Sequence, residues 1–173
     1  MFDIMAATRL EALHVTEDSA TGLQATIAIH STRLGPALGG CRYLAYADTR
    51  SALLDAAHLA QSMSYKAALA GLPCGGGKAV ILRPAHVANR GALFEAFGRF
   101  IETLNGRYIT AVDSGTRAED MDCIAQHTQH VTSTRSAGNP SPHTAMGVFA
   151  GIRASAMARL GSADLQGLRI AVQ

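Results

Sequence analysis

Tryptophan is absent from this chain of 173 residues, and aromatic residues make up only 5% of it. No apolar run approaches the roughly 18 residues that a membrane-spanning helix needs. The first residues, MFDIMAATRLEAL, lack the basic region and apolar core of a secretory signal. We therefore expect neither a membrane span nor a secretory signal.

Cysteine and clustered charge are also scarce. The three cysteines lie far apart without C-x-x-C spacing, so we do not expect a disulfide framework. We expect a reducing, cytoplasmic location. The net charge of +2 comes from scattered residues, without a basic cluster that would indicate nucleic acid or an anionic membrane as a partner. With 48% hydrophobic residues, the chain can form one domain with a substantial core.

Two nucleotide-binding motifs are missing. No G-x-G-x-x-G occurs, so the chain has no dinucleotide fingerprint. A phosphate-binding P-loop ending at Lys78 would need glycine at position 72 and serine or threonine at position 79, where the chain has leucine and alanine. The lysine therefore needs another explanation.

Strand-like and helix-like segments alternate along the chain. Short runs rich in β-branched residues predict strands at 23–30, 79–83 and 107–112. Apolar residues stepping by three and four predict a helix over 51–67, and a second helix opens at Asn89 with Leu93, Phe97, Phe100 and Leu104 buried and Gly106 as its stop. This order predicts an α/β fold with helices on a mixed sheet.

Two further helices are predicted from their first residues. Thr116 and Glu119 fit the T-x-x-E capping box, and Thr144 could cap a helix that ends at Gly161. The final residues, LRIAVQ, read as one more strand. That strand either closes the sheet of this domain or begins a further domain.

The segment SYKAALAGLPCGGGKAVI sets Lys66 and Lys78 on either side of a glycine-rich loop. Glycines let backbone and substrate approach closely, and two ammonium groups beside them could hold an anion. If the two lysines are close, repulsion and burial would lower the pKa of Lys78 and make it a base. Alternatively, Lys66 faces a helix C-terminus and Lys78 extends to solvent.

Asp113 follows an apolar strand in TAVDSGT, at a position where α/β folds collect functional groups. A carboxylate there could neutralise a lysine and exchange protons with a substrate nitrogen, or it could serve only as a turn residue. The proline-containing loop GNPSPHTA, residues 138–145, suits a hinge, a pocket wall or a plain entry to a helix.

Cys123, His127 and His130 have a spacing that a continuous helix would align as metal ligands. The strand-like HVTST indicates that the helix ends before His130, and no fourth ligand is evident. We expect no metal site.

Four motifs, GPALGGCRY, SYKAALAGLPCGGGKAVI, NGRYITAVDSGT and GNPSPHTA, together resemble the leucine, valine and phenylalanine dehydrogenases of the amino-acid dehydrogenase superfamily. The resemblance covers nearly the whole chain. It implies a three-layer α/β/α domain with a mixed, mostly parallel sheet, truncated before the Rossmann domain. It assigns residues 1–143 to substrate binding and oligomerisation, 144–166 to a linking helix and turn, and 167–173 to the first strand of an NAD-binding domain that the chain lacks.

The same resemblance implies roles for individual residues. Lys66 would bind the substrate α-carboxylate, Lys78 would be the catalytic lysine that activates water, and Asp113 would move protons at the substrate nitrogen. Gly39 and Gly40 would leave room for the substrate. The implied substrate-binding residues are Lys66, Leu38, Gly39, Gly40, Met63 and Ala111, and the implied cofactor contacts are Thr144 and Asn139.

The implied reaction is NAD-dependent, reversible oxidative deamination of an L-amino acid to a 2-oxo acid and ammonia. Leu38 stands where the similar glutamate dehydrogenases carry a lysine for the distal carboxylate, and Ala111 resembles the leucine and valine enzymes. These two residues favour branched-chain substrates. Val112 departs from the glutamate common in the leucine enzymes, which changes the surroundings of Asp113.

Two alternatives stay open: an aromatic amino-acid dehydrogenase, acting on phenylalanine or tryptophan, and a non-catalytic binding or oligomerisation module. We expect the whole enzyme to be a homo-oligomer, and this chain alone to be inactive because the cofactor domain is missing.

Overall fold

The computed structural model describes residues 1–138 and 140–171. The chain divides into two compact units, Met1–Gly138 and Asn139–Gln173, which are described separately. The first unit contains the sheet and the residues on which most of the predictions fall.

A mixed sheet organises the first unit, with strand order β1-β2-β4-β3-β5. Strands β3 and β4 are parallel, as are β3 and β5, while β2 is antiparallel to both of its neighbours. It follows that β1, β3, β4 and β5 run in one direction and only β2 opposes them, which confirms the predicted mixed, mostly parallel sheet. The strand bounds are β1 Ala12–Asp18, β2 Leu23–Ser31, β3 Ala37–Leu44, β4 Gly75–Leu82 and β5 Tyr108–Val112.

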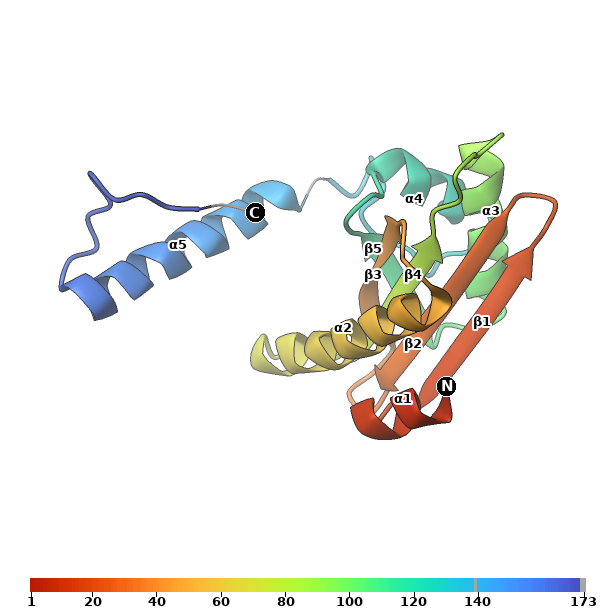
Figure 1. Ribbon diagram of the computed structural model, residues 1–173, viewed down its shortest axis with the longest axis horizontal. Coiled ribbons are helices and arrows are strands. Elements are labelled where there is room, and N and C mark those ends of the chain that lie inside the picture. Colours follow the sequence, from red (N-terminus) through yellow and green to blue (C-terminus); the bar gives the residue numbers. More distant parts are fainter. Residues whose placement is uncertain (139, 172–173) are drawn as a thin grey trace. The chain divides into compact units, whose positions relative to one another are not determined.

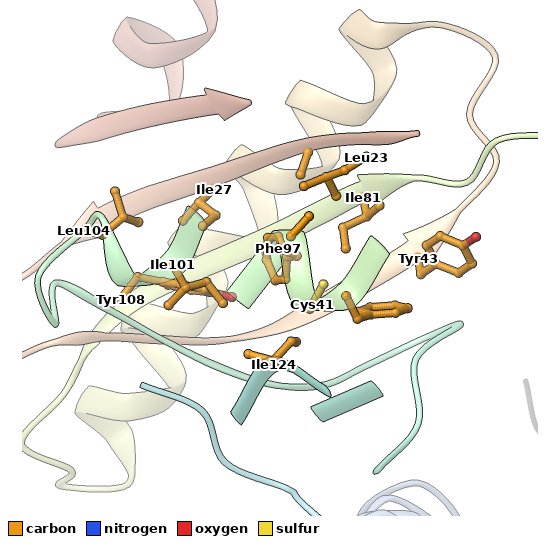
Figure 2. Packing of buried hydrophobic residues seen from close by; sticks show 14 of the residues in the cluster. Leu23, Ile27, Cys41, Tyr43, Ile81, Phe97, Ile101, Leu104, Tyr108 and Ile124 are labelled. Carbon is orange, nitrogen blue, oxygen red and sulfur yellow. The ribbon is translucent and has the colours of Figure 1, made fainter. Parts of the chain in front are cut away.

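Helices cover both faces of this sheet (Figure 1). Helices α1 and α2 pack on one face around small residues such as Ala56 and Ala60. Helices α3 and α4 pack on the other, where Leu93, Phe97 and Ile124 meet strand residues including Tyr108 (Figure 2). The three-layer α/β/α prediction is confirmed. The helix bounds are α1 Phe2–Thr8, α2 Thr49–Leu69, α3 Arg90–Glu102, α4 Ala118–Ala125 and, in the second unit, α5 Ser141–Leu160.

The glycines at 75–77 form the start of β4, which corrects the prediction of a loop at this point. They are needed for close packing. A Cβ on Gly76 would lie 2.2 Å from the backbone nitrogen of Ser64 on α2. A Cβ on Gly77 would lie 2.8 Å from the ring of Tyr108 on the opposite face. The strand therefore has bare backbone where helix α2 and the aromatic core press against it.

The predicted helix starts were right in one case and wrong in two. Asn89 caps α3 as predicted, since its side chain accepts a hydrogen bond from Ala92 N. Helix α4 begins after Arg117, whose backbone N–H donates to Asp120, so Thr116 does not form the predicted capping box. Thr144 lies inside α5 rather than at its cap, which is Pro140.

The second unit consists of α5 and the segment after it. Gly161 ends the helix with φ 75°, as predicted. The described residues 168–171 of the predicted final strand have no regular structure, and Val172 and Gln173 lie outside the described residues. Within the part of the chain that is described, no helix combines the length and the apolarity needed to cross a bilayer.

Candidate active site

Three adjacent parallel strands, β4, β3 and β5, bring the predicted site residues to one face of the sheet. Neighbouring strand residues Ala79, Cys41 and Tyr108 belong to the core beneath α3 and α4. Because side chains alternate along a strand, Lys78 and Arg42 point to the opposite face, toward α2. The register pairs Gly40 with Ala111 across β3 and β5.

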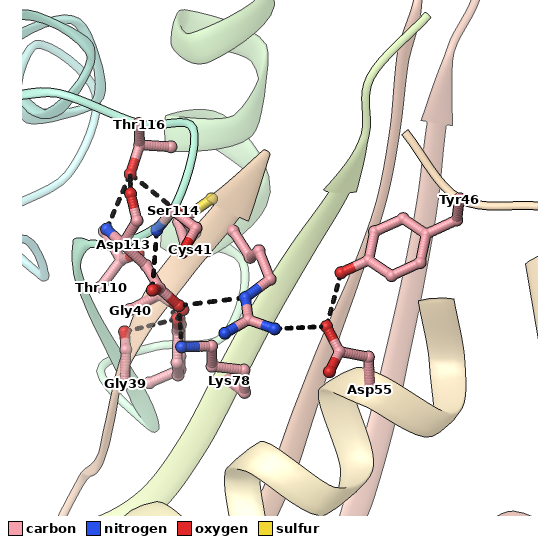
Figure 3. Close-up of polar contacts among 12 residues, drawn as sticks. Gly39, Gly40, Cys41, Tyr46, Asp55, Lys78, Thr110, Asp113, Ser114 and Thr116 are labelled. Carbon is pink, nitrogen blue, oxygen red and sulfur yellow. Dashed lines mark hydrogen bonds and ion pairs between the residues drawn. The ribbon is translucent and has the colours of Figure 1, made fainter. Parts of the chain in front are cut away.

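Lys78 and Asp113 form an ion pair at the centre of this face (Figure 3). The ammonium donates to Asp113 Oδ2. The lysine side chain is only 7% exposed and the aspartate side chain 20%, so the pair is largely removed from water. A lone buried ammonium would be costly, and the carboxylate compensates its charge. Lys78 therefore does not extend to solvent, which excludes that alternative.

Burial by itself raises the pKa of the Asp113 carboxyl, but several contacts outweigh it. The hydrogen bond and charge of Lys78 act together with the Ser114 backbone N–H, which donates to Asp113 Oδ1 at 2.7 Å, and with the charge of Arg42. The net effect lowers the pKa of Asp113 below the usual aspartate value. Asp113 is thus ionised at neutral pH.

This lowered pKa predicts a pH-dependent contribution to stability. A carboxyl with a folded-state pKa below its unfolded value, near 3.9, stabilises the fold fully above that value. The contribution is lost as the pH falls through the folded-state pKa. Urea unfolding of the parent and of Asp113→Asn should therefore differ most at neutral pH and progressively less below about pH 4. A difference that stays constant down to about pH 2 would contradict this assignment.

Thr116 holds the turn that carries Asp113. Its hydroxyl donates to Cys41 O and Asp113 O, each at 2.9 Å, and accepts from Asp113 N at 2.8 Å. Gly115 completes the turn with φ 83°, and a Cβ there would lie 2.0 Å from Tyr43 O, so a side chain would not fit. The hydroxyl ties the turn to β3 and so fixes the position of the carboxylate.

We expect Thr116→Val to destabilise the chain by about 1–2 kcal/mol, because valine keeps the shape but leaves the Asp113 N–H and two carbonyl groups without this partner. Urea denaturation measures the change. Ser114→Ala is the matched control in the same turn, since the hydrogen bond of Ser114 comes from its backbone nitrogen. Equal stabilities of the two variants would show that the Thr116 hydroxyl does not hold the turn.

A second polar group, not predicted from the sequence, lies beside this pair. Arg42 on β3 donates from one terminal nitrogen to Asp55 Oδ2 on α2 at 2.8 Å, and Tyr46 donates its hydroxyl to the same oxygen at 2.6 Å. The Nε atom of Arg42 lies 3.5 Å from Asp113 Oδ2. Strand alternation from Gly40 would have placed Arg42 on this face, but nothing in the sequence signals its pairing with a helix residue.

Gly39 and Gly40 lie against other atoms of this chain, so the space left by their missing side chains is used for packing within the domain. The prediction was that this space serves the substrate. A Cβ on Gly39 would lie 1.7 Å from Gly77 O on β4. A Cβ on Gly40 would lie 2.7 Å from the Cβ of Asp113. Gly40 therefore allows the aspartate side chain to cross β3 and reach Lys78.

The other predicted substrate-binding residues border this centre without joining it. Leu38 and Ala111 are half-buried, on β3 and β5. Met63 is half-buried on α2, next to Ser64, which contacts Gly76. Lys66 is exposed in the last turn of α2, and among the described residues its side chain has no hydrogen bond or ion pair. The structure thus brings Lys78 and Asp113 together and leaves Lys66 free.

The predicted cofactor contacts belong to the second unit. Thr144 is exposed and its hydroxyl donates to Pro140 O at 3.3 Å. Asn139 lies outside the described residues. Helix α4 ends at Ala125, before His130 as predicted, and His127 also lies beyond its end. No group of three or more metal-binding side chains occurs in the ranges 1–138 and 140–171.

A lysine on β4 and an aspartate just after β5 are paired across the intervening strand β3, under one helical layer, and they define an α/β domain with a polar centre on one face. The model of the family described as Glu/Leu/Phe/Val dehydrogenase, dimerisation domain, matches residues 9–130, which include this centre. The chain belongs to the Glu/Leu/Phe/Val dehydrogenase family.

Individual relatives agree with this assignment. The chain is 49% identical over 177 residues to leucine dehydrogenase from Bacillus subtilis (strain 168), covering 100% of this chain and 49% of the relative. It is 46% identical over 166 residues to valine dehydrogenase from Streptomyces virginiae, covering 94% and 46%. The crystal structure of L-tryptophan dehydrogenase from Nostoc punctiforme superposes with a TM-score of 0.74 at 39% identity, covering 97% of this chain and 47% of that one. The chain spans about half the length of the curated relatives it matches.

Proposed function

We propose that this chain is the substrate-binding half of an NAD-dependent L-amino-acid dehydrogenase that deaminates branched-chain amino acids. The observation that carries the proposal is the buried Lys78–Asp113 pair beside the apolar residues Leu38 and Ala111. Membership of the family supplies the reaction class, and the similarity to leucine and valine dehydrogenases supplies the substrate class.

The dinucleotide is assigned to a part of the protein outside this chain. The sequence has no glycine-rich dinucleotide motif, and the hydroxyl of Thr144 is directed to the Pro140 carbonyl of its own helix. These residues do not fit an NAD site by themselves. The proposed contacts of Thr144 and Asn139 with the cofactor would therefore be secondary.

Lys78 and Asp113 supply the two proton-handling groups that deamination requires. Their ionised pair sits where a substrate nitrogen could compete with the lysine for the carboxylate. In the proposed reaction Asp113 accepts and returns protons at that nitrogen. Lys78 first releases its ammonium proton to water, and the neutral amine then takes a proton from the attacking water. Lys66, exposed and without a partner among the described residues, would bind the α-carboxylate as a point charge.

The side-chain preference follows from the apolar residues near the pair. Leu38 and Ala111, with Met63 on α2, would line the side-chain pocket without offering a charged partner. Desolvating the distal carboxylate of glutamate there would cost several kcal/mol. The similarity to an L-tryptophan dehydrogenase keeps an aromatic substrate as the second candidate.

We also propose a cytoplasmic homo-oligomer. The matching family model describes a dimerisation domain, which supports self-association through this chain. All three cysteines are free, as expected in a reducing compartment.

The whole protein that contains this chain tests the proposed reaction. We expect L-leucine and NAD to yield NADH, ammonia and 4-methyl-2-oxopentanoate in equal amounts, and the reverse reaction to consume them. A fusion of this chain to the C-terminal half of the Bacillus subtilis leucine dehydrogenase gives an independent version of the test. A folded, oligomeric whole protein that forms no NADH with any amino acid would favour the non-catalytic module.

A further inference from the structure

Arg42 lies between two carboxylates from different layers of the domain, Asp55 of α2 and Asp113 just after β5. One terminal nitrogen is hydrogen-bonded to Asp55 of α2, which Tyr46 also contacts, and Nε faces Asp113 at 3.5 Å. The arginine side chain is 23% exposed and that of Asp55 29%, so water screens these charges only in part. The guanidinium is thereby fixed at one end and free to interact at the other.

The free end is a buried donor without a hydrogen bond. Among the described residues, Arg42 Nε has no hydrogen-bond partner although its surface is inaccessible to water. It faces Oδ2 of Asp113, the same oxygen that accepts from Lys78. Buried N–H groups are normally satisfied, so an unpaired one aimed at a carboxylate requires an explanation.

The chemistry proposed for Lys78 provides that explanation. A lysine that acts as a base must be neutral for part of the cycle, and a neutral lysine no longer compensates the charge of Asp113. A guanidinium keeps its proton throughout the physiological pH range. Arg42 can thus provide a positive charge beside Asp113 after Lys78 has lost its own.

We propose that Arg42, held by Asp55, to which Tyr46 also donates, is a positioning residue. When Lys78 loses its proton or turns to the substrate, Arg42 compensates the charge of the Asp113 carboxylate in its place. This inference rests on the proposed function for the reaction, but its electrostatic part concerns this chain alone. Arg42 Nε then completes its hydrogen bond to Oδ2, and Asp113 stays ionised and oriented.

The other groups around Asp113 do not offer this charge. Cys41 and Tyr108 interact with it, but burial raises the pKa of both side chains, which keeps them neutral. Ser114 contributes a backbone N–H. Asp55, the other partner of Arg42, carries the same sign as Asp113 and is compensated by Arg42 itself.

A purely structural role makes a different prediction. As a brace between β3 and α2, Arg42 would affect the stability of the fold and leave the titration of Asp113 unchanged. The two roles are therefore separated by measuring the carboxylate directly.

The first experiment titrates the Asp113 carboxyl of this chain by carbon-13 NMR, with Asp113→Asn to assign the signal. We expect Arg42→Met to raise the Asp113 midpoint by about one pH unit. In a Lys78→Met background, which imitates the neutral lysine, Arg42→Met should raise the Asp113 midpoint by a larger amount. An Asp113 midpoint insensitive to Arg42 in both backgrounds would overturn the proposal.

Arg107→Met is the matched control, since Arg107 also pairs with a carboxylate, that of Glu11 at 3.0 Å, but it lies just before β5, at the end of the strand away from Asp113. It should change stability and leave the Asp113 midpoint in place. If Arg42→Met does not fold, Asp55→Asn releases the guanidinium instead. That variant should alter the Asp113 midpoint if Arg42 needs its anchor, and no change would count against the proposal.

The second experiment uses the whole protein. Arg42→Met should lower kcat at least tenfold with little change in KM, Arg42→Lys should restore part of the loss, and Arg107→Met should match the parent per folded molecule. An unchanged kcat in Arg42→Met would overturn the positioning role. A parent without dehydrogenase activity would overturn the proposed function instead, while the NMR coupling would still decide the interaction of Arg42 with Asp113.

Discussion

Replacing Lys78 by methionine should lower kcat of the whole protein by about a thousandfold, within the range expected for loss of a general base. Methionine fills the space of the lysine stem on β4, which is buried, so the fold should persist. The Asp113 carboxylate loses its hydrogen-bonded partner but keeps Arg42 at 3.5 Å. Steady-state kinetics and circular dichroism of the same preparation separate loss of chemistry from loss of structure.

Lys66→Met is the matched control for that variant. Lys66 is exposed at the end of α2, and we propose that it binds the substrate carboxylate and takes no proton. Its replacement should mainly raise KM for the amino acid. A Lys78→Met enzyme that retains more than about a tenth of the parent kcat would contradict the assignment of Lys78 as a base.

Gly39→Ala should reduce the free energy of unfolding more than any other substitution proposed above, by more than about 4 kcal/mol, or prevent folding. The added Cβ would lie 1.7 Å from Gly77 O and 2.5 Å from Gly77 C, both backbone atoms of the neighbouring strand. A side chain could rotate away, but paired β3 and β4 cannot separate without losing their ladder. Soluble yield and the urea midpoint of the chain measure the effect.

Gly91→Ala is the control in the same unit. Its Cβ would have ordinary contacts, the nearest at 3.4 Å, and it lies in helix α3, where alanine is favoured over glycine by up to about 1 kcal/mol. It should leave the urea midpoint equal or slightly higher. A Gly39→Ala chain as stable as Gly91→Ala would show that β3 and β4 are not packed as described.

The main elements could be predicted from the sequence because their patterns are local. Leu53, Ala56 and Ala60 belong to the apolar residues whose spacing by three and four predicts the helix over 51–67, and all three are buried. The glycines at 75–77 were interpreted as a loop because glycine carries no side-chain pattern, and only the packing of Ser64 and Tyr108 shows why that strand must be bare.

The candidate site was predictable only in part. Family resemblance pointed to Lys78 and Asp113, which the fold pairs. The link from Arg42 to Asp55 depends on how α2 crosses β3, which no local pattern records. Thr116 illustrates the same limit. Its spacing to Glu119 fits a capping box, whereas its hydroxyl is in fact hydrogen-bonded within the Asp113 turn.

The specificity constants of the whole protein for L-leucine, L-valine, L-phenylalanine, L-tryptophan and L-glutamate test the proposed role of this chain most directly. With Leu38 and Ala111 beside the Lys78–Asp113 pair, we expect leucine or valine to exceed both aromatic amino acids at least tenfold in kcat/KM. Glutamate should be disfavoured more strongly, because the proposed lining residues Leu38, Ala111 and Met63 offer no cation to its second carboxylate. A preference for tryptophan, phenylalanine or glutamate would contradict a branched-chain pocket built on these strands.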